Sequence, residues 1–154
     1  MREREMKTVL QREELLHDIS NLAYVIADVS EGKESPHTLH QTFDICEEGN
    51  TERVERLLGL AAAEIGSEMG KGISIRHRRK NYVLTFCGVT EKTVAKVTEL
   101  AREYMVASVL HGWLSVTLPA AATFWANRRD ETLSSLRSAA TPPTGGFTRR
   151  VSPI

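Results

Sequence analysis

The most concentrated chemistry in the sequence is a run of cations. Arg76, Arg78, Arg79 and Lys80 fall within five consecutive residues, with His77 among them. Closely spaced cations can bind the phosphate groups of DNA, because the contact releases counterions. Aromatic residues that could stack on bases are sparse around the run. The same cations could instead contact an acidic protein surface or stay solvated. We expect contact with a partner protein, and non-specific DNA contact stays open.

A second cationic segment lies at residues 141–154, with the sequence TPPTGGFTRRVSPI. It holds three of the five prolines and has no hydrophobic periodicity, which predicts an extended C-terminal arm. A partner could bind its cations and its larger apolar side chains, which include Phe147, Arg149, Arg150 and Ile154. An arm that becomes ordered on a partner and an arm without a partner fit the composition equally well.

Histidine and cysteine side chains could hold a metal ion. His37, His40 and Cys46 fall within ten residues, and Cys87 could complete a zinc site. However, there is no Cys-x-x-Cys pair, and Cys87 lies in an apolar run that is typical of a strand. We therefore expect surface histidines beside a buried Cys46, with no metal and no cofactor.

Patterns that would indicate an enzyme are weak. The segment 66–71 has three residues between its glycines where a Walker phosphate loop has four, and Gly72 stands where that loop has Ser or Thr. A helix C-terminus accounts for these glycines. There is no Gly-x-Ser-x-Gly motif, and we interpret His111, which has apolar neighbours, as a packed core histidine. The carboxylates within 44–48 fit a solvated acidic face, so we expect a protein that is not an enzyme.

A mainly helical chain must position these residues. Apolar side chains at steps of three and four predict amphipathic helices over 2–30 and 51–69. Weaker periodicity allows one short helix within 35–50. Residues 72–88 change to an alternating period, which predicts a β-hairpin with a basic tip, although no Asn-Gly or Asp-Gly turn supports it.

The second half of the chain predicts two further helices. Thr90 can cap a long helix over 91–116, whose end is apolar on nearly all sides and should form the buried centre of a bundle. Pro119 suits the first turn of another helix that reaches about residue 139. The predicted fold class is therefore mainly α, a helical bundle with one small β-hairpin and an extended C-terminal arm.

The organisation that follows is one helical domain over 1–140, with a hairpin insertion at about 72–88, and an arm over 141–154. The composition agrees with one such domain, because 154 residues with 41% hydrophobic content suffice for one core. The longest mostly apolar stretch, 104–124, is interrupted by polar residues, glycine and proline, so we expect no membrane partner.

The formal net charge is zero, but the two halves of the chain differ. Residues 1–70 hold 7 basic and 15 acidic side chains, whereas residues 71–154 hold 13 basic and 5 acidic ones, so the halves carry −8 and +8. This pattern excludes a uniformly basic nucleic-acid coat. Unlike surfaces favour head-to-tail association, which closes into a ring or propagates as a filament.

Several segments together resemble a known class of proteins. They are HTLHQTFDICEEGNTERVERLLGLAAAEI (37–65), YVLTF (82–86), HGWLSVTLPAAATFW (111–125) and RRVSPI (149–154). In overall pattern the chain resembles small helical proteins encoded in bacteriophage and prophage structural modules. The resemblance implies a non-enzymatic virion subunit, a head–tail connector or neck component, which assembles as a homo-oligomeric ring. It also implies contacts with portal or tail components, and a location in the virion and, during assembly, in the host cytoplasm.

Two alternatives belong to other functional classes. A small helical DNA-binding or regulatory protein could use the basic hairpin, and its affinity would then fall steeply with salt. A metal-dependent enzyme could use His37, His40 and Cys46, and it would need stoichiometric metal.

Overall fold

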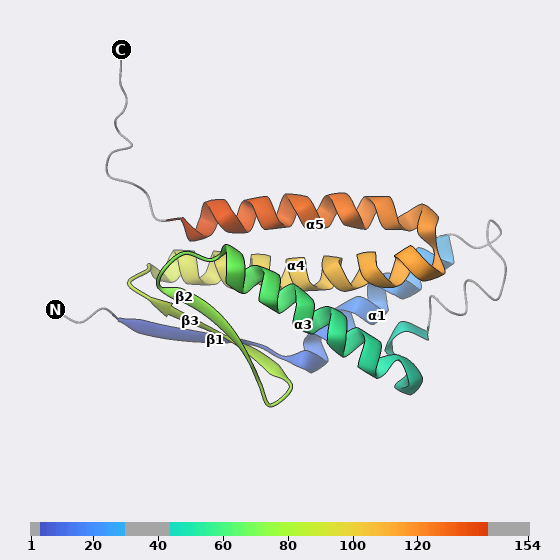
Figure 1. The fold of residues 1–154 in the computed structure, drawn as a ribbon, viewed down its shortest axis with the longest axis horizontal. Helices are drawn as coiled ribbons and strands as arrows, with labels where there is room; N and C mark the ends of the chain where they lie inside the picture. Colours follow the sequence, from blue (N-terminus) through green and yellow to red (C-terminus); the bar gives the residue numbers. More distant parts are fainter. Residues whose placement is uncertain (1–3, 30–43, 142–154) are drawn as a thin grey trace, which may run out of the picture.

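The computed structural model describes residues 4–29 and 44–141. Its elements are β1 (Glu5–Leu10), α1 (Arg12–Val29), the 3-10 helices η1 (Asp44–Cys46) and η2 (Glu48–Asn50), α3 (Thr51–Glu68), β2 (Ile73–Arg78), β3 (Asn81–Cys87), α4 (Glu91–Thr117) and α5 (Pro119–Ala140). The predicted mainly α class with a small hairpin is confirmed (Figure 1). The predicted arm, apart from Thr141, lies outside the described residues.

Helix α4 is the centre of the molecule. It contacts α5, α3, α1 and β1, and Figure 1 shows it between α5 and the sheet. Residues 104–110 of this helix are all buried, as the apolar run predicted, but the last turn is not, since Val116 is 70% exposed. Thr90 caps the helix, because its hydroxyl accepts a hydrogen bond from the backbone N–H of Thr93 at 3.2 Å. Pro119 then occupies the first turn of α5.

The prediction of one helix over 2–30 is wrong for Glu5–Leu10, which form strand β1. This strand pairs antiparallel with β3 along its whole length. The hydroxyl of Thr8 lies 2.8 Å from that of Thr98 on α4, so the strand also contacts the central helix. The apolar residues Met6, Val9 and Leu10 have helical spacing, and on the strand Val9 is exposed, so the distant partner β3 decides the structure of this segment.

The described strands form an antiparallel sheet in the order β1-β3-β2. Along the central strand β3, buried residues alternate with half-buried ones, so one face of the sheet packs inward. Its inward side chains are Tyr82, Leu84 and Phe86. Helix α3 contacts β2 and helix α4 contacts β1, whereas the opposite face of the sheet carries the half-buried residues.

The hairpin begins at a position that requires glycine. Gly72 has a φ of 94°, and a Cβ atom there would lie 2.7 Å from the carbonyl oxygen of Cys87. The backbone of the same two residues also closes the hairpin, because the N–H of Cys87 donates a hydrogen bond to the carbonyl oxygen of Gly72 at 2.7 Å. An L side chain at residue 72 would therefore disturb both the backbone conformation and the closing bond.

Ion pairs join the two halves of the chain whose charges differ. Acidic side chains of the first half pair with arginines of the second half in Asp18–Arg102, Glu64–Arg129 and Glu68–Arg137. The first pair connects α1 to α4, and the other two connect α3 to α5. Part of the opposite charge that the sequence suggested for self-assembly is therefore neutralised inside one molecule.

The remaining predictions have mixed outcomes. Helix 51–69 is present as α3, with Val54, Leu58, Ala61 and Ile65 among its buried residues. The predicted helix within 35–50 is replaced by η1 and η2 over Asp44–Asn50, and residues 35–43 lie outside the described parts. Within the described ranges, no helix combines the length and apolar character needed to cross a membrane.

Candidate functional site

The tip of the β2–β3 hairpin is a two-residue turn with a strained backbone. Arg79 and Lys80 have φ values of 50° and 71°, and the flanking Arg78 and Asn81 are paired across the strands. Positive φ at both central positions is the pattern of a type I′ turn, which favours Asn-Gly. Residues with a Cβ atom cost about 1 kcal/mol or more each in this region. The hairpin thus keeps two cations where smaller residues fit better.

The strand register extends this cationic tip across the outer face of the sheet. Val83 on β3 lies between Val9 on β1 and Arg76 on β2, and the next row of this face includes Lys7. The side chains of this face on β1 and β2 are exposed, because the helices pack on the other side. We name the basic sheet face by its cations, which are Lys7, Arg76, Arg78, Arg79 and Lys80.

The arginines of this face differ from the other described arginines, because they have no ion-pair partner within the described parts of the chain. Among residues 4–29 and 44–141, Arg76, Arg78 and Arg79 have no ion pair with a carboxylate. Every other arginine in those ranges has a carboxylate or aromatic partner: Arg4, Arg12, Arg53, Arg56, Arg102, Arg128, Arg129 and Arg137. The basic sheet face therefore presents guanidinium groups whose hydrogen-bonding capacity is left for a partner outside this part of the chain.

His77 is not part of this face. Its ring stacks on Tyr82 with the centroids 4.6 Å apart and the planes 15° apart. The start of α1 supports the other side of the tip, since the backbone N–H of Arg12 donates to Oδ1 of Asn81 at 2.9 Å. The side chain of Arg12 in turn pairs with Glu55 on α3. These contacts position the hairpin tip relative to two helices. The exposed guanidinium groups can bind planar anions, either carboxylates or phosphates.

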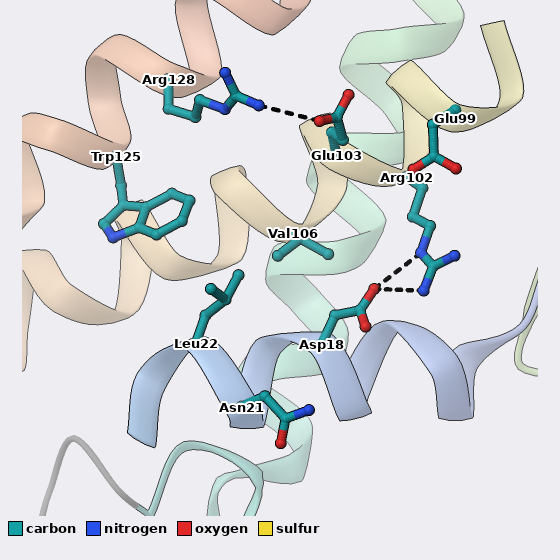
Figure 2. Close-up of a pocket in the computed structure, with 9 residues that line it drawn as sticks. All are labelled: Asp18, Asn21, Leu22, Glu99, Arg102, Glu103, Val106, Trp125 and Arg128. Carbon is teal, nitrogen blue, oxygen red and sulfur yellow. Dashed lines mark hydrogen bonds and ion pairs between the residues drawn. The ribbon is translucent and has the colours of Figure 1, made fainter. Parts of the chain in front are cut away.

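A second candidate site is a groove between α1, α4 and α5, which Figure 2 shows in close-up. It has a volume of about 590 Å³. Its apolar part comes from one side chain on each helix, namely Leu22, Val106 and Trp125. Figure 2 shows Leu22 and Trp125 extending toward the same space beside Val106. We call this site the α1–α4–α5 groove.

Charged residues line the rest of the groove. Arg102 binds Asp18 through two nitrogens, Nη2 at 2.7 Å and Nε at 2.9 Å from the same carboxylate oxygen. Arg128 donates to Oε1 of Glu103 at 3.0 Å. The hydrogen bond with Asp18 raises the pKa of Arg102, and nearby Glu99 adds to the shift. Glu99 itself lines the groove near Arg102 but forms no ion pair with any described residue.

The structure does not place all of the predicted site residues. Phe147, Arg149, Arg150 and Ile154 lie outside the described residues, as do the potential metal ligands His37 and His40. Over the residues that the structure does describe, no group of three or more His, Cys, Asp or Glu side chains could hold a metal ion.

Cysteine and histidine residues of the described parts have ordinary surroundings. The thiol of Cys46 is half-buried and lies 3.5 Å from the carbonyl oxygen of Leu16, and burial raises its pKa. Cys87 ends β3, with its sulfur 4.0 Å from a carboxylate oxygen of Glu5. His111 is only partly buried, so it lies at the edge of the core and not within it as the sequence predicted.

Sequence reasoning missed Lys7 and the whole groove. The apolar spacing around Lys7 predicts a helix, which gives no indication of its place on the sheet. The groove is lined by residues of three helices, and hydrophobic periodicity does not predict how these helices are arranged relative to one another. One local signal was present: Phe124 is 63% exposed, and it lies beside Trp125 in an apolar first half of α5. Exposed aromatic residues of this kind indicate a contact surface.

Comparison with protein-family models, with curated proteins and with solved structures found no match for this chain.

Proposed function

We propose that this protein is a non-enzymatic structural subunit of a phage particle, a head–tail connector or neck component that assembles by head-to-tail contacts. The observation that carries the proposal is the basic sheet face. Its three arginines have no carboxylate partner in the described parts of the chain, whereas the other arginines there are all engaged. A row of unengaged guanidinium groups suits binding to an acidic surface on a neighbouring protein.

The strained turn supports a role in binding. Arg79 and Lys80 occupy positive-φ positions at a cost of about 1 kcal/mol or more each, which folding alone would avoid. Strained residues that persist in a fold are often held there for function. The resemblance of the chain to phage structural proteins supplies the class of assembly, and portal or tail components are the proposed partners within a virion.

The test compares two variants that lose the same positive charge. The first removes the hairpin arginines by Arg76→Ser, Arg78→Ser and Arg79→Asn. The matched control removes three exposed lysines that also have no ion pair in the described regions, by Lys71→Ser, Lys92→Ser and Lys96→Ser. Sedimentation and negative-stain imaging of the purified full chain measure its assembly.

We expect the unmodified chain and the lysine control to form rings or another repeated assembly. The hairpin variant should lose this assembly. Both variants lose three positive charges, so a difference between them would be due to the position of the charges and not to their number. A protein that stays monomeric at high concentration, or equal assembly of both variants, contradicts the proposal.

The same basic face also favours the second candidate, a small DNA-binding protein. Contact with about three or four phosphates predicts an affinity that falls with salt at a slope near −3 in logarithmic units. Titration of a labelled duplex with the full chain at several salt concentrations tests this. DNA binding that depends on the hairpin arginines, in a protein that does not assemble, would favour this candidate over the first.

A further inference from the structure

We propose that the α1–α4–α5 groove binds residues 147–154 of a second copy of this chain. This inference rests on the proposed function in one respect, which is self-assembly. It names a contact between copies through which the protein would assemble. The groove is described by the structure, and the occupant is identified by its chemistry and its reach.

The apolar part of the groove requires an apolar occupant. Leu22, Val106 and Trp125 face a space of about 590 Å³, and the neighbouring Phe124 is 63% exposed. Such a surface gains free energy when apolar side chains displace water from it, at roughly 25 cal/mol for each Å² covered. Several aromatic or branched aliphatic side chains are needed to fill this space, because one such residue is much smaller than the groove.

The charges on the rim select a basic occupant. Two of the groove's carboxylates, Asp18 and Glu103, are already neutralised by Arg102 and Arg128. Glu99 is not, and it also lines a smaller adjoining cavity. Glu14 lines that second cavity and, like Glu99, has no ion pair in the described residues, although Arg102 lies near both. Three carboxylates, Asp18, Glu99 and Glu14, thus share one guanidinium group, so this end of the apolar floor keeps a net negative charge.

Residues 147–154, with the sequence FTRRVSPI, match both requirements. They place two adjacent cations, Arg149 and Arg150, between apolar residues, and they contain no acidic side chain. The apolar side chains can cover the floor while the arginines bind Glu99 and Glu14 in bidentate geometry. The basic hairpin fits the groove less well, because its run of consecutive cations offers nothing for the floor.

The reach of the chain favours a second copy over the same copy. Helix α5 rises about 20 Å between Arg128, at the groove, and Thr141. Thr141 has an extended backbone, and the Pro-Pro sequence after it cannot continue the helix. Six residue steps connect Thr141 to Phe147, and they span at most about 21 Å when fully extended. Phe147 would therefore reach its own groove only if this connection ran straight back along α5 without slack, whereas binding to a second copy does not require this.

Photo-cross-linking of the full chain tests the contact. Phe147 is replaced by p-benzoylphenylalanine, and this chain is mixed with an equal amount of heavy-isotope-labelled copies. After irradiation, mass spectrometry identifies the linked peptides and the isotope composition of each pair. We expect links from position 147 to peptides that contain Leu22, Val106 or Trp125, and we expect pairs that combine light and heavy copies.

Other linked sites overturn the proposal. Links confined to copies of one isotope would place the segment in its own groove. Links to residues 30–43, to the basic sheet face, or to no peptide at all would exclude the groove as its site. Rings that form without groove links would contradict this contact but not the proposed function. Groove links in a protein that forms no rings would support this contact and contradict the proposed function.

A charge exchange tests the rim. Glu99→Lys should lower the yield of groove links about tenfold, because it opposes the arginines of the segment. Adding Arg149→Glu and Arg150→Glu to the other copy should restore the yield. Glu13→Lys, an equal change on an exposed α1 residue that does not line the groove, is the matched control and should leave it unchanged. Equal effects of Glu99→Lys and Glu13→Lys would contradict the pairing.

Discussion

Arg79 and Lys80 show how a single turn can combine strain with charge. Both residues have a left-handed backbone that asparagine and glycine adopt at lower cost, and both are exposed cations. These residues therefore lower the stability of the fold, whereas the proposed role has them strengthen binding. Substitutions at the turn can separate these two effects.

We expect the double substitution Arg79→Asn with Lys80→Gly to stabilise the protein by about 1–2 kcal/mol, because Asn-Gly suits a type I′ turn. Urea unfolding of the purified chain measures the change. Arg78→Asn is the control, since it removes charge from a strand position and should give no gain. A double variant that is no more stable than the wild type would show that the turn carries little strain.

A second residue-scale prediction concerns Tyr82. Its side chain is buried, and its hydroxyl has no hydrogen-bond partner in the described residues. Burial raises the pKa of Tyr82, with a further contribution from Glu55, while Arg12 opposes the shift. Above about pH 10 the unfolded chain loses this proton while the folded chain keeps it, so the free energy of unfolding falls as pH rises.

Tyr82→Phe should therefore reduce the loss of stability between about pH 9 and pH 11, and at neutral pH it should change stability by less than about 1 kcal/mol. Urea unfolding across this pH range measures both effects. Tyr24→Phe, at a residue that is 61% exposed, is the control and should retain the wild-type pH dependence. Identical alkaline curves for wild type and Tyr82→Phe would show that another group titrates.

At the scale of elements, α5 is attached to the rest of the fold differently along its length. Its second half buries Thr132, Leu136 and Ala140. Arg129 pairs with Glu64 on α3 and also lies over the ring of Tyr104, 5.5 Å from its centroid. The first half of α5, residues 119–131, has no buried residue. It forms one wall of the groove through Trp125 and Arg128. One helix thus serves the core at one end and presents a surface at the other.

Two adjacent arginines of α5 test this division. Arg129→Ala should cost about 1–2 kcal/mol of stability, because it removes a partly buried ion pair and a cation–π contact. Arg128→Ala, which removes the more exposed pair with Glu103, should cost less than about 0.5 kcal/mol. Chemical unfolding of both variants gives the comparison. Similar losses would mean that α5 is held evenly along its length.

At the scale of the whole molecule, folding and association use different parts of the chain. The core lies among α1, α3, α4 and the inner face of the sheet, whereas the basic sheet face is the outer face of the sheet and the groove lies among α1, α4 and α5. A subunit with unlike surfaces on two sides can associate head to tail.

Removal of residues 142–154 should separate these two parts. We expect the shortened chain to keep its free energy of unfolding within about 0.5 kcal/mol, since surface changes away from the core have small effects. Its assembly should be lost, as measured by sedimentation at matched concentrations. A large loss of stability would show that the segment belongs to the fold, and unchanged assembly would show that it makes no contact between copies.

The sequence alone determined the elements whose signals are local. Helices α3, α4 and α5 follow from apolar spacing, from the cap at Thr90 and from Pro119, and the hairpin follows from an alternating period. The arginine run at the hairpin was visible for the same reason, since its residues are neighbours in the chain. Phe147 and its cationic neighbours were also identified locally, and they remain a prediction.

Only the tertiary structure decided what depends on distant residues. Glu5–Leu10 form a strand because β3 lies beside them, although their own apolar pattern also allows a helix. The groove exists because three helices converge, and no single helix records that arrangement. The charges of the two halves were counted correctly from the sequence, but Asp18–Arg102 and the α3–α5 pairs show that part of them is neutralised internally. Charge is a property of composition, whereas its availability to a partner depends on which side chains the fold brings together.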